Sequence, residues 1–255
     1  MLKIVICILA GLGAGLGTGF AGMSAAAVIS PMLIAFLDMD PYMAVGIALA
    51  SDVLASAVSA ITYGRNKNLD IRNGLIMMAS VLCFTALGSF VASIVPKTTM
   101  GNFSVIMTLL LGIKFIVKPV VAPKQRLTDA TTAQKVIRSI LGGALVGFIC
   151  GFVGAGGGMM MLLVLTSLLG YELKTAVGTS VFIMSVTALT GAASHFAIGG
   201  MPDPVALILC VVSTLVFAQV AALFANRAQP KTLNRVTGAV LVVLGTAILI
   251  VNFCK

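Results

Sequence analysis

The chain of 255 residues has no tryptophan, one histidine and few charged side chains, which make up 9% of the sequence. A soluble globular domain carries about 25% charged residues, because its surface must be solvated by water. Hydrophobic residues here account for 60%. The shortage of charge therefore excludes an ordinary soluble domain and favours a protein that is embedded in lipid.

Catalytic and metal-binding motifs are also missing from the sequence. The five cysteines stand singly in apolar stretches, without a CxxC motif or metal-ligand spacing, and we interpret them as small buried thiols. A direct role for Cys150, which follows a glycine ladder, stays open. We find no nucleophile–base pair or cofactor motif, so neither an enzyme nor a bound cofactor is predicted. The GxGxxG pattern that ends at Gly22 lies in an apolar segment with no preceding strand and does not indicate a dinucleotide site.

Long apolar runs dominate what is present. Residues 74–96 and 205–225 contain no charged residue and can cross a hydrocarbon core of about 30 Å as helices. The alternating pattern of a membrane β-barrel is absent. We expect ten helical segments, at residues 3–20, 24–37, 41–63, 73–95, 101–121, 136–153, 157–169, 173–197, 204–225 and 233–253.

The chain is internally duplicated. Residues 11–64 align with residues 143–196 without a gap, so that Gly11, Gly15, Gly19 and Gly22 correspond to Gly143, Gly147, Gly151 and Gly154. Such duplication is typical of secondary transporters. The sequence thus predicts an all-α polytopic membrane protein with two five-segment repeats, 1–122 and 136–255, joined by a linker at 123–135.

Two of the expected segments, 24–37 and 157–169, are short for a membrane crossing, and each follows a glycine cluster. They are either short crossing helices or arms of re-entrant hairpins. Both alternatives give an odd number of crossings per repeat, so the two repeats are expected to have inverted topology.

Basic residues predict the orientation, because short cytoplasmic loops carry an excess of lysine and arginine. Three basic residues, Lys3, Lys97 and Lys255, fall on one side of the expected segments. Twelve fall on the other: Arg65, Lys67, Arg72, Lys118, Lys124, Arg126, Lys135, Arg138, Lys174, Arg227, Lys231 and Arg235. Both termini should therefore lie outside. The same distribution accounts for the net charge of +9 without nucleic-acid binding.

The glycine clusters before the two short segments indicate an anion site. A break before a helix leaves unpaired backbone N–H groups at the helix start, where the helix dipole also favours negative charge. Such starts occur at residues 22–26 and 154–158, and in inverted repeats they would approach each other near the midplane. We interpret the glycines at spacing four, by contrast, as packing surfaces between helices. The backbone candidates for the anion site are Gly22, Ser24, Ala25, Gly154, Gly156, Gly157 and Gly158.

Polar side chains on the following helices could complete this site. Thr179 and Ser180 can donate hydroxyl hydrogen bonds, and Ser51 occupies a nearby level in the first repeat. Each of these hydroxyls could equally bond to its own helix. Asp52 stands in the middle of an apolar segment, where a carboxylate is costly and usually functional, which favours proton or cation coupling over direct anion binding.

His195 and Tyr63 occupy equivalent positions near the ends of the third segments of the two repeats. A lone histidine is more often structural than a ligand, but a gating or proton-relay role stays open for this pair. The run Met159, Met160 and Met161 could suggest a soft metal site. Consecutive helical residues point in different directions, however, so packing is favoured and no metal site is predicted.

Two motifs carry a family resemblance. GFICGFVGAGGG at residues 147–158 and AVGTSV at 176–181 resemble the TauE/SafE sulfite-exporter family, also called TSUP, and the first repeat has the same layout at residues 15–33 and 44–49. The first repeat departs from the pattern, because Ser24-Ala25-Ala26 replaces the triple glycine and Ile47-Ala48 replaces the Thr-Ser pair.

This resemblance implies a multi-pass transporter of the bacterial or archaeal plasma membrane. Its expected cargo is sulfite, an organosulfonate or a related small anion, and its expected direction is export. A passive anion channel and an importer of a related anion are the alternatives, while a membrane enzyme is disfavoured. The expected partners are the anion and the lipid bilayer, and a homodimer is left open.

Overall fold

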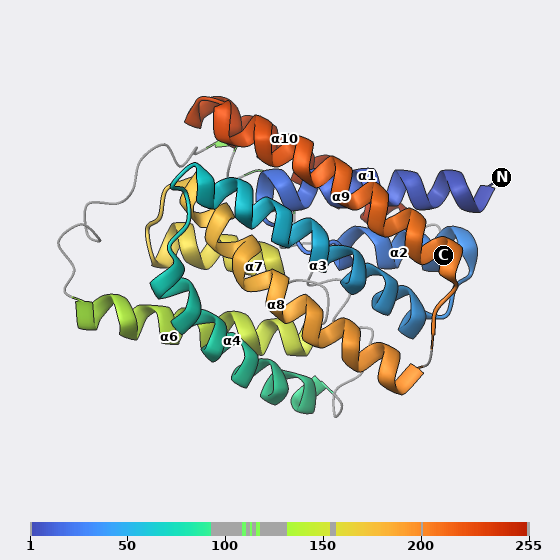
Figure 1. Ribbon diagram of the computed structural model, residues 1–255, viewed down its shortest axis with the longest axis horizontal. Coiled ribbons are helices and arrows are strands. Elements are labelled where there is room, and N and C mark those ends of the chain that lie inside the picture. The colour runs from blue at the N-terminus through green and yellow to red at the C-terminus, as the bar shows by residue number, and fades with distance from the viewer. Residues whose placement is uncertain are drawn as a thin grey trace.

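The computed structural model describes residues 2–92, 132–153, 157–199 and 201–253, together with residues 109, 110, 113, 116 and 117. All regular elements in these ranges are helices (Figure 1), which confirms the all-α prediction. Among the described residues, four helices are long and apolar enough to cross a membrane: Leu2–Ala21, Met43–Arg65, Leu173–Ala197 and Pro204–Arg227.

The helices follow the expected segments within a few residues. The first half contains α1 (Leu2–Ala21), α2 (Ala26–Leu37), α3 (Pro41–Arg65) and α4 (Ile71–Ala92). The second half contains α6 (Thr132–Val153), α7 (Gly157–Leu163), the π-helix η2 (Val164–Leu168), α8 (Leu173–Gly199), α9 (Pro204–Arg227) and α10 (Pro230–Phe253). Most of the expected segment 101–121 and of the linker 123–135 lies outside the described residues.

Helices α3 and α8, which correspond in the two repeats, lie antiparallel. Near the start of α3, a Cβ on Gly46 would lie 3.3 Å from Cβ of His195, close to the end of α8. Near the start of α8, a Cβ on Gly178 would lie 2.8 Å from Cβ of Tyr63, close to the end of α3. The internal alignment converts one contact into the other.

The first helix of each half packs on the fourth helix of the other half, α1 on α9 and α6 on α4. Glycine allows the close approach between α1 and α9. A Cβ on Gly15 would lie 2.6 Å from the carbonyl oxygen of Thr214, and one on Gly19 would lie 2.6 Å from that of Ala218. These contacts confirm that the glycines at spacing four form packing surfaces, as small residues do between membrane helices.

Most basic residues gather at one end of the helix bundle. The end of α9 reaches the other basic loops, because Lys174 Nζ donates to the backbone carbonyl of Asn226 at 2.9 Å and Asn68 Nδ2 donates to the Asn226 side chain at 2.7 Å. Helix α1 begins and α10 ends at the opposite end of the molecule (Figure 1). The described residues of this basic end are Arg65, Lys67, Arg72, Lys135, Arg138, Lys174, Arg227, Lys231 and Arg235.

Replacement of Gly143 by alanine should destabilise the fold. The new Cβ would lie 2.7 Å from the carbonyl oxygen of Met77 and 2.8 Å from Cβ of Ser80, so α6 must move away from α4. We expect a loss of about 1–3 kcal/mol, the usual cost of overpacking, measured as a lower melting temperature in detergent. Gly64→Ala is the control, because its Cβ would meet only the flexible tip of Leu69 at 3.3 Å. Equal stability of the two variants would contradict close packing at Gly143.

The basic end should face the cytoplasm. The positive-inside rule places loops rich in lysine and arginine there, and the opposite end retains Lys3 among the described basic residues. Single cysteines in a background without reactive native cysteines, at position 67 and at position 201, should distinguish the ends. We expect a membrane-impermeant maleimide added to intact cells to label position 201 and to spare position 67. The reverse pattern would overturn the orientation.

Candidate functional site

The turn after α1 lies against the start of α7. Gly22 ends α1 with a φ of +60°, a conformation that favours glycine, and the chain then enters α2. Gly158, at the start of α7, is so close to this turn that a Cβ on it would lie 2.5 Å from the backbone nitrogen of Ser24 and 2.6 Å from the carbonyl oxygen of Gly22. We call this meeting point, Gly22–Ser24 with Gly158, the junction.

Ser180 contacts the junction. Its hydroxyl donates a hydrogen bond to the carbonyl of Gly22 at 3.1 Å, and a Cβ on Gly22 would lie 3.0 Å from Cβ of Ser180. Thr179 points elsewhere, because its hydroxyl oxygen accepts a hydrogen bond from the backbone N–H of Asp70 at 3.2 Å, just before α4. Ser51 donates to the carbonyl of Ile47 in its own helix at 2.8 Å. Of the three expected hydroxyls, the structure brings one to the junction.

The side chain of Asp52, a residue of α3, lies at the start of α2. Its side chain is fully buried in the middle of α3. Ser24 Oγ donates to Asp52 Oδ2 at 2.8 Å, and Ser56 Oγ donates to Asp52 Oδ1 at 2.8 Å. The backbone N–H of Ala25 also bonds to the carboxylate. The donors that a substrate anion would use at this helix start are therefore bound to the protein's own carboxylate.

The second half has no carboxylate at the corresponding position. In the internal alignment, Met184 of α8 corresponds to Asp52 of α3. Met184 approaches the start of α7 in the same way, because its Sδ would lie 2.7 Å from a Cβ on Gly158. The two helix starts thus differ chemically. One meets a carboxylate and the other meets an apolar thioether.

Tyr63 and His195 lie far from each other at opposite ends of α3. Tyr63 is fully buried, and its hydroxyl donates to the carbonyl of Gly19 at 2.8 Å, where α1 approaches its end. This bond satisfies a carbonyl that the helix end would otherwise leave unpaired. His195 is half-buried on α8 and lies beside Gly46.

A polar cluster closes the basic end near the π-helix. The hydroxyl of Tyr171, in the loop before α8, donates to Asp70 Oδ2 at 2.7 Å, and Asn73 Nδ2 donates to the same oxygen at 2.6 Å. Burial raises the pKa of the Tyr171 hydroxyl above its ordinary value, and the Asp70 carboxylate raises it further. Tyr171 is therefore a neutral donor that ties this loop to the start of α4.

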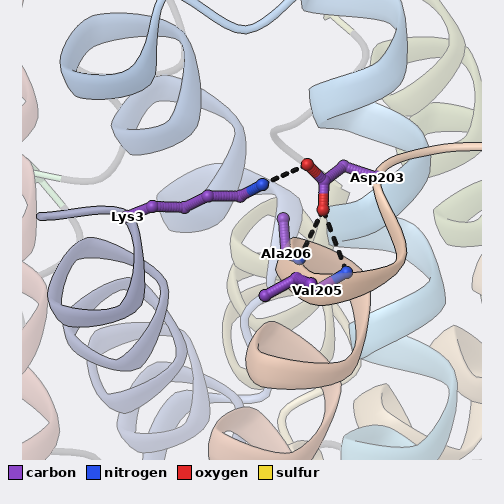
Figure 2. Close-up of polar contacts among 4 residues, drawn as sticks. All are labelled: Lys3, Asp203, Val205 and Ala206. Carbon is purple, nitrogen blue, oxygen red and sulfur yellow. Dashed lines mark hydrogen bonds and ion pairs between the residues drawn. The ribbon is translucent and has the colours of Figure 1, made fainter. Parts of the chain in front are cut away.

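At the opposite end, Lys3 and Asp203 form an ion pair that joins the starts of α1 and α9 (Figure 2). Asp203 Oδ1 also caps α9, because it accepts hydrogen bonds from the backbone N–H groups of Val205 at 2.9 Å and Ala206 at 3.1 Å. The Lys3 ammonium holds the pKa of the Asp203 carboxyl below its usual value, and the bonds from the α9 backbone lower it further. Both charged side chains are over one-third exposed, so the pair adds little stability.

Some predicted positions cannot be compared with the structure. Gly154 and Gly156 lie outside the described residues, and Gly157 is placed as the first residue of α7. The described part of the chain contains no group of three or more histidine, cysteine, aspartate or glutamate side chains that could hold a metal ion. The sequence singled out Asp52 but missed its contact with Ser24, because that contact joins residues on two different helices.

Comparisons with known proteins agree with the layout. A family model described as "Sulfite exporter TauE/SafE" matches residues 7–248. The chain is 26% identical over 264 residues to the probable membrane transporter protein YunE of Bacillus subtilis, covering 96% of each chain. It is 24% identical over 216 residues to the probable membrane transporter protein YdhB of the same species, covering 83% of this chain and 86% of that one. The probable membrane transporter protein MJ0441 of Methanocaldococcus jannaschii is 24% identical over 269 residues, covering 98% and 97%.

Proposed function

The chain belongs to the sulfite exporter TauE/SafE family, and from this premise we propose that it exports a small sulfur-containing anion, such as sulfite or an organosulfonate, across the plasma membrane. The family and the relatives are membrane transporters and not enzymes. The substrate class and the direction are the proposal.

The junction is the observation that carries this proposal. The turn after α1 and the start of α7, one from each half, meet at Ser24 and Gly158, close to Asp52 at the middle of α3. Helix starts of this kind bind anions with backbone N–H groups and a favourable dipole, without needing a basic side chain. In transporters with repeated halves, substrate sites lie where the halves meet near the bilayer midplane. Ser180 supplies a hydroxyl at the same place.

Asp52 gives the junction a means of coupling. While its carboxylate holds Ser24 Oγ and the Ala25 N–H, a second anion at this helix start would be repelled. Protonation removes the negative charge, so Asp52 no longer repels the substrate and holds these donors less strongly. By linkage, anion binding and proton binding at Asp52 then favour each other. The anion and the proton are therefore expected to bind together.

A passive anion channel is the alternative that the same helix starts allow. The close approach of Gly158 to Ser24 and Gly22 favours a transporter whose halves must move to admit the anion. Direction follows from the driving force. A proton carried with the anion cancels one charge, so the membrane potential, worth about 2.3 kcal/mol per charge at 100 mV, acts weakly on that step. Export would then be driven by accumulation of the anion inside the cell, which must outweigh the pH gradient that opposes outward movement of the proton.

Counterflow in proteoliposomes tests the function. Vesicles that contain the purified protein are loaded with unlabelled sulfite, thiosulfate, sulfoacetate, taurine or sulfate, and the uptake of the labelled compound is followed. A transporter exchanges at least one of these compounds, and the uptake of the labelled compound slows when the unlabelled compound is absent from the vesicle interior. Rapid flux of all the anions that follows the voltage alone would favour the channel. Uptake against a concentration gradient in right-side-out vesicles would favour the importer.

Replacement of Asp52 by asparagine should uncouple transport from protons. Asparagine cannot ionise but can still accept hydrogen bonds from Ser24 and Ala25, so the helix start keeps a partner. We expect counterflow close to wild type, with anion binding and net transport no longer dependent on pH. In the wild type, anion affinity should fall as pH rises, because the ionised carboxylate competes for the donors. If transport by the variant kept the pH dependence of the wild type, Asp52 would have a structural role and would not couple transport to protons.

Replacement of Gly157 by leucine should abolish anion binding. A bulky side chain at the first residue of α7 blocks the approach of the substrate to the backbone N–H groups. Binding is measured as protection of thermal stability by the anion found in counterflow. Gly143→Ala is the matched control, because it weakens helix packing away from the junction and should still bind the anion. Near-wild-type affinity in Gly157→Leu would show that the site lies elsewhere.

A further inference from the structure

Asp52 is one member of a polar stripe on α3, which we define as Asp52, Ser56, Ser59 and Tyr63. Spacings of four, three and four residues place the side chains on one face of the helix. All four side chains are completely buried, each with 0% exposure. Polar groups inside a membrane helix are costly, and they usually mark a path for ions or protons.

This polar stripe faces the break between α1 and α2. At one end Asp52 accepts the hydrogen bond from Ser24, which follows the break. At the other end the Tyr63 hydroxyl donates to the carbonyl of Gly19, which precedes the break. Ser56 and Ser59 lie on the same face of α3 between these two contacts. The stripe leads from the middle of the membrane toward the basic end, where α3 terminates at Arg65.

The hydroxyl of Ser59 is buried and has no hydrogen-bond partner among the described residues. Ser56, one turn away, has its hydroxyl hydrogen directed at Asp52 Oδ1 at 2.8 Å. Buried hydroxyls in proteins are normally paired with a protein group or with an ordered water. A water that bonds to Ser59 and donates to Ser56 Oγ would satisfy Ser59 and would extend the chain of hydrogen bonds that ends at Asp52.

We propose that the polar stripe is a proton path that connects Asp52 with the basic end of the protein. This proposal rests on the coupling role proposed for Asp52, and it adds the route that the proton takes. The water at Ser59 gives a proton to Ser56 Oγ, and Ser56 passes its own hydroxyl proton to Asp52 Oδ1. The Tyr63 hydroxyl turns from the Gly19 carbonyl to give its proton to this water and takes a proton back from the solution at the basic end. Tyrosine, water and serine are then unchanged, and the carboxylate has become a carboxylic acid.

Asp52 bonds to polar groups on two sides, the start of α2 and the stripe, and of these the stripe leads toward the basic end. The groups that bond to its carboxylate are Ser24 and Ala25 from the start of α2 and Ser56 from its own helix. Within the described residues no basic side chain forms an ion pair with it. The Tyr63 hydroxyl, held by Gly19, forms the end of the stripe nearest the basic loops.

The test follows the protonation of Asp52 directly and needs no substrate. The purified full-length protein in lipid is subjected to a rapid drop in pH, and infrared spectroscopy records the carboxylic acid band that Asp52→Asn removes. We expect Ser59→Ala to slow the appearance of this band by about a hundredfold, the lower end of the effect of a positioned proton carrier. Ser59→Thr retains the hydroxyl and should restore the rate.

Ser139→Ala is the matched control, because Ser139 on α6 is also buried and its hydroxyl is also unpartnered among the described residues. Neither alanine variant removes a hydrogen bond between two protein groups, so we expect both to keep a melting temperature close to that of the wild type. A wild-type rate in Ser59→Ala, or equal slowing in Ser139→Ala, would overturn the proton path, as would a wild-type protein without a band from Asp52. Failure of counterflow for every anion would instead reject the proposed substrate class and leave this result standing.

Discussion

The structure depends on one constraint, that backbone polar groups inside a membrane must find partners within the protein. A continuous helix meets this constraint by itself, but the break after α1 does not. The chain supplies partners from other elements. The Thr18 hydroxyl donates to the carbonyl of Met23 at 2.9 Å, Tyr63 bonds to Gly19, and Ser180 bonds to Gly22. The break is thus held by side chains of both halves, and this requirement brings the halves together at the junction.

Close packing is the second consequence of the lipid environment. Between membrane helices the hydrophobic effect is absent, so association relies on close van der Waals contact and hydrogen bonds. Glycine permits such contact along α1 against α9 and along α6 against α4. Because each pair joins helices from different halves, neither half is a separate unit. A movement that opens the junction must therefore carry α1 with α9 and α6 with α4.

Much of the architecture was accessible from the sequence, because hydropathy and glycine or proline breaks are local signals. They predicted the bounds of the helices, the short segments after the breaks, and Asp52 as an unusual intramembrane carboxylate. The hydrogen-bond partners of these side chains were not accessible from the sequence. Nothing near Ser24 in the sequence indicates that its hydroxyl meets Asp52, and the neighbours Thr179 and Ser180 differ in role because they point to different helices. Such pairings depend on the register between helices that are distant in the chain.

The chemical difference between the two helix starts has a further consequence. In a fully symmetric pair, both starts would compete equally for one anion. Here the carboxylate of Asp52 accepts a hydrogen bond from Ser24 at the start of α2, while Met184 lies at the corresponding place beside α7. A thioether neither repels an anion nor titrates, so the charge at the junction depends on one carboxylate. Protonation of that single group removes a charge at the start of α2 and, because Gly158 lies against Ser24, also changes the electrostatic potential at the start of α7. The two helix starts of this duplicated scaffold therefore differ in chemistry, because one lies beside an ionisable carboxylate and the other lies beside a thioether.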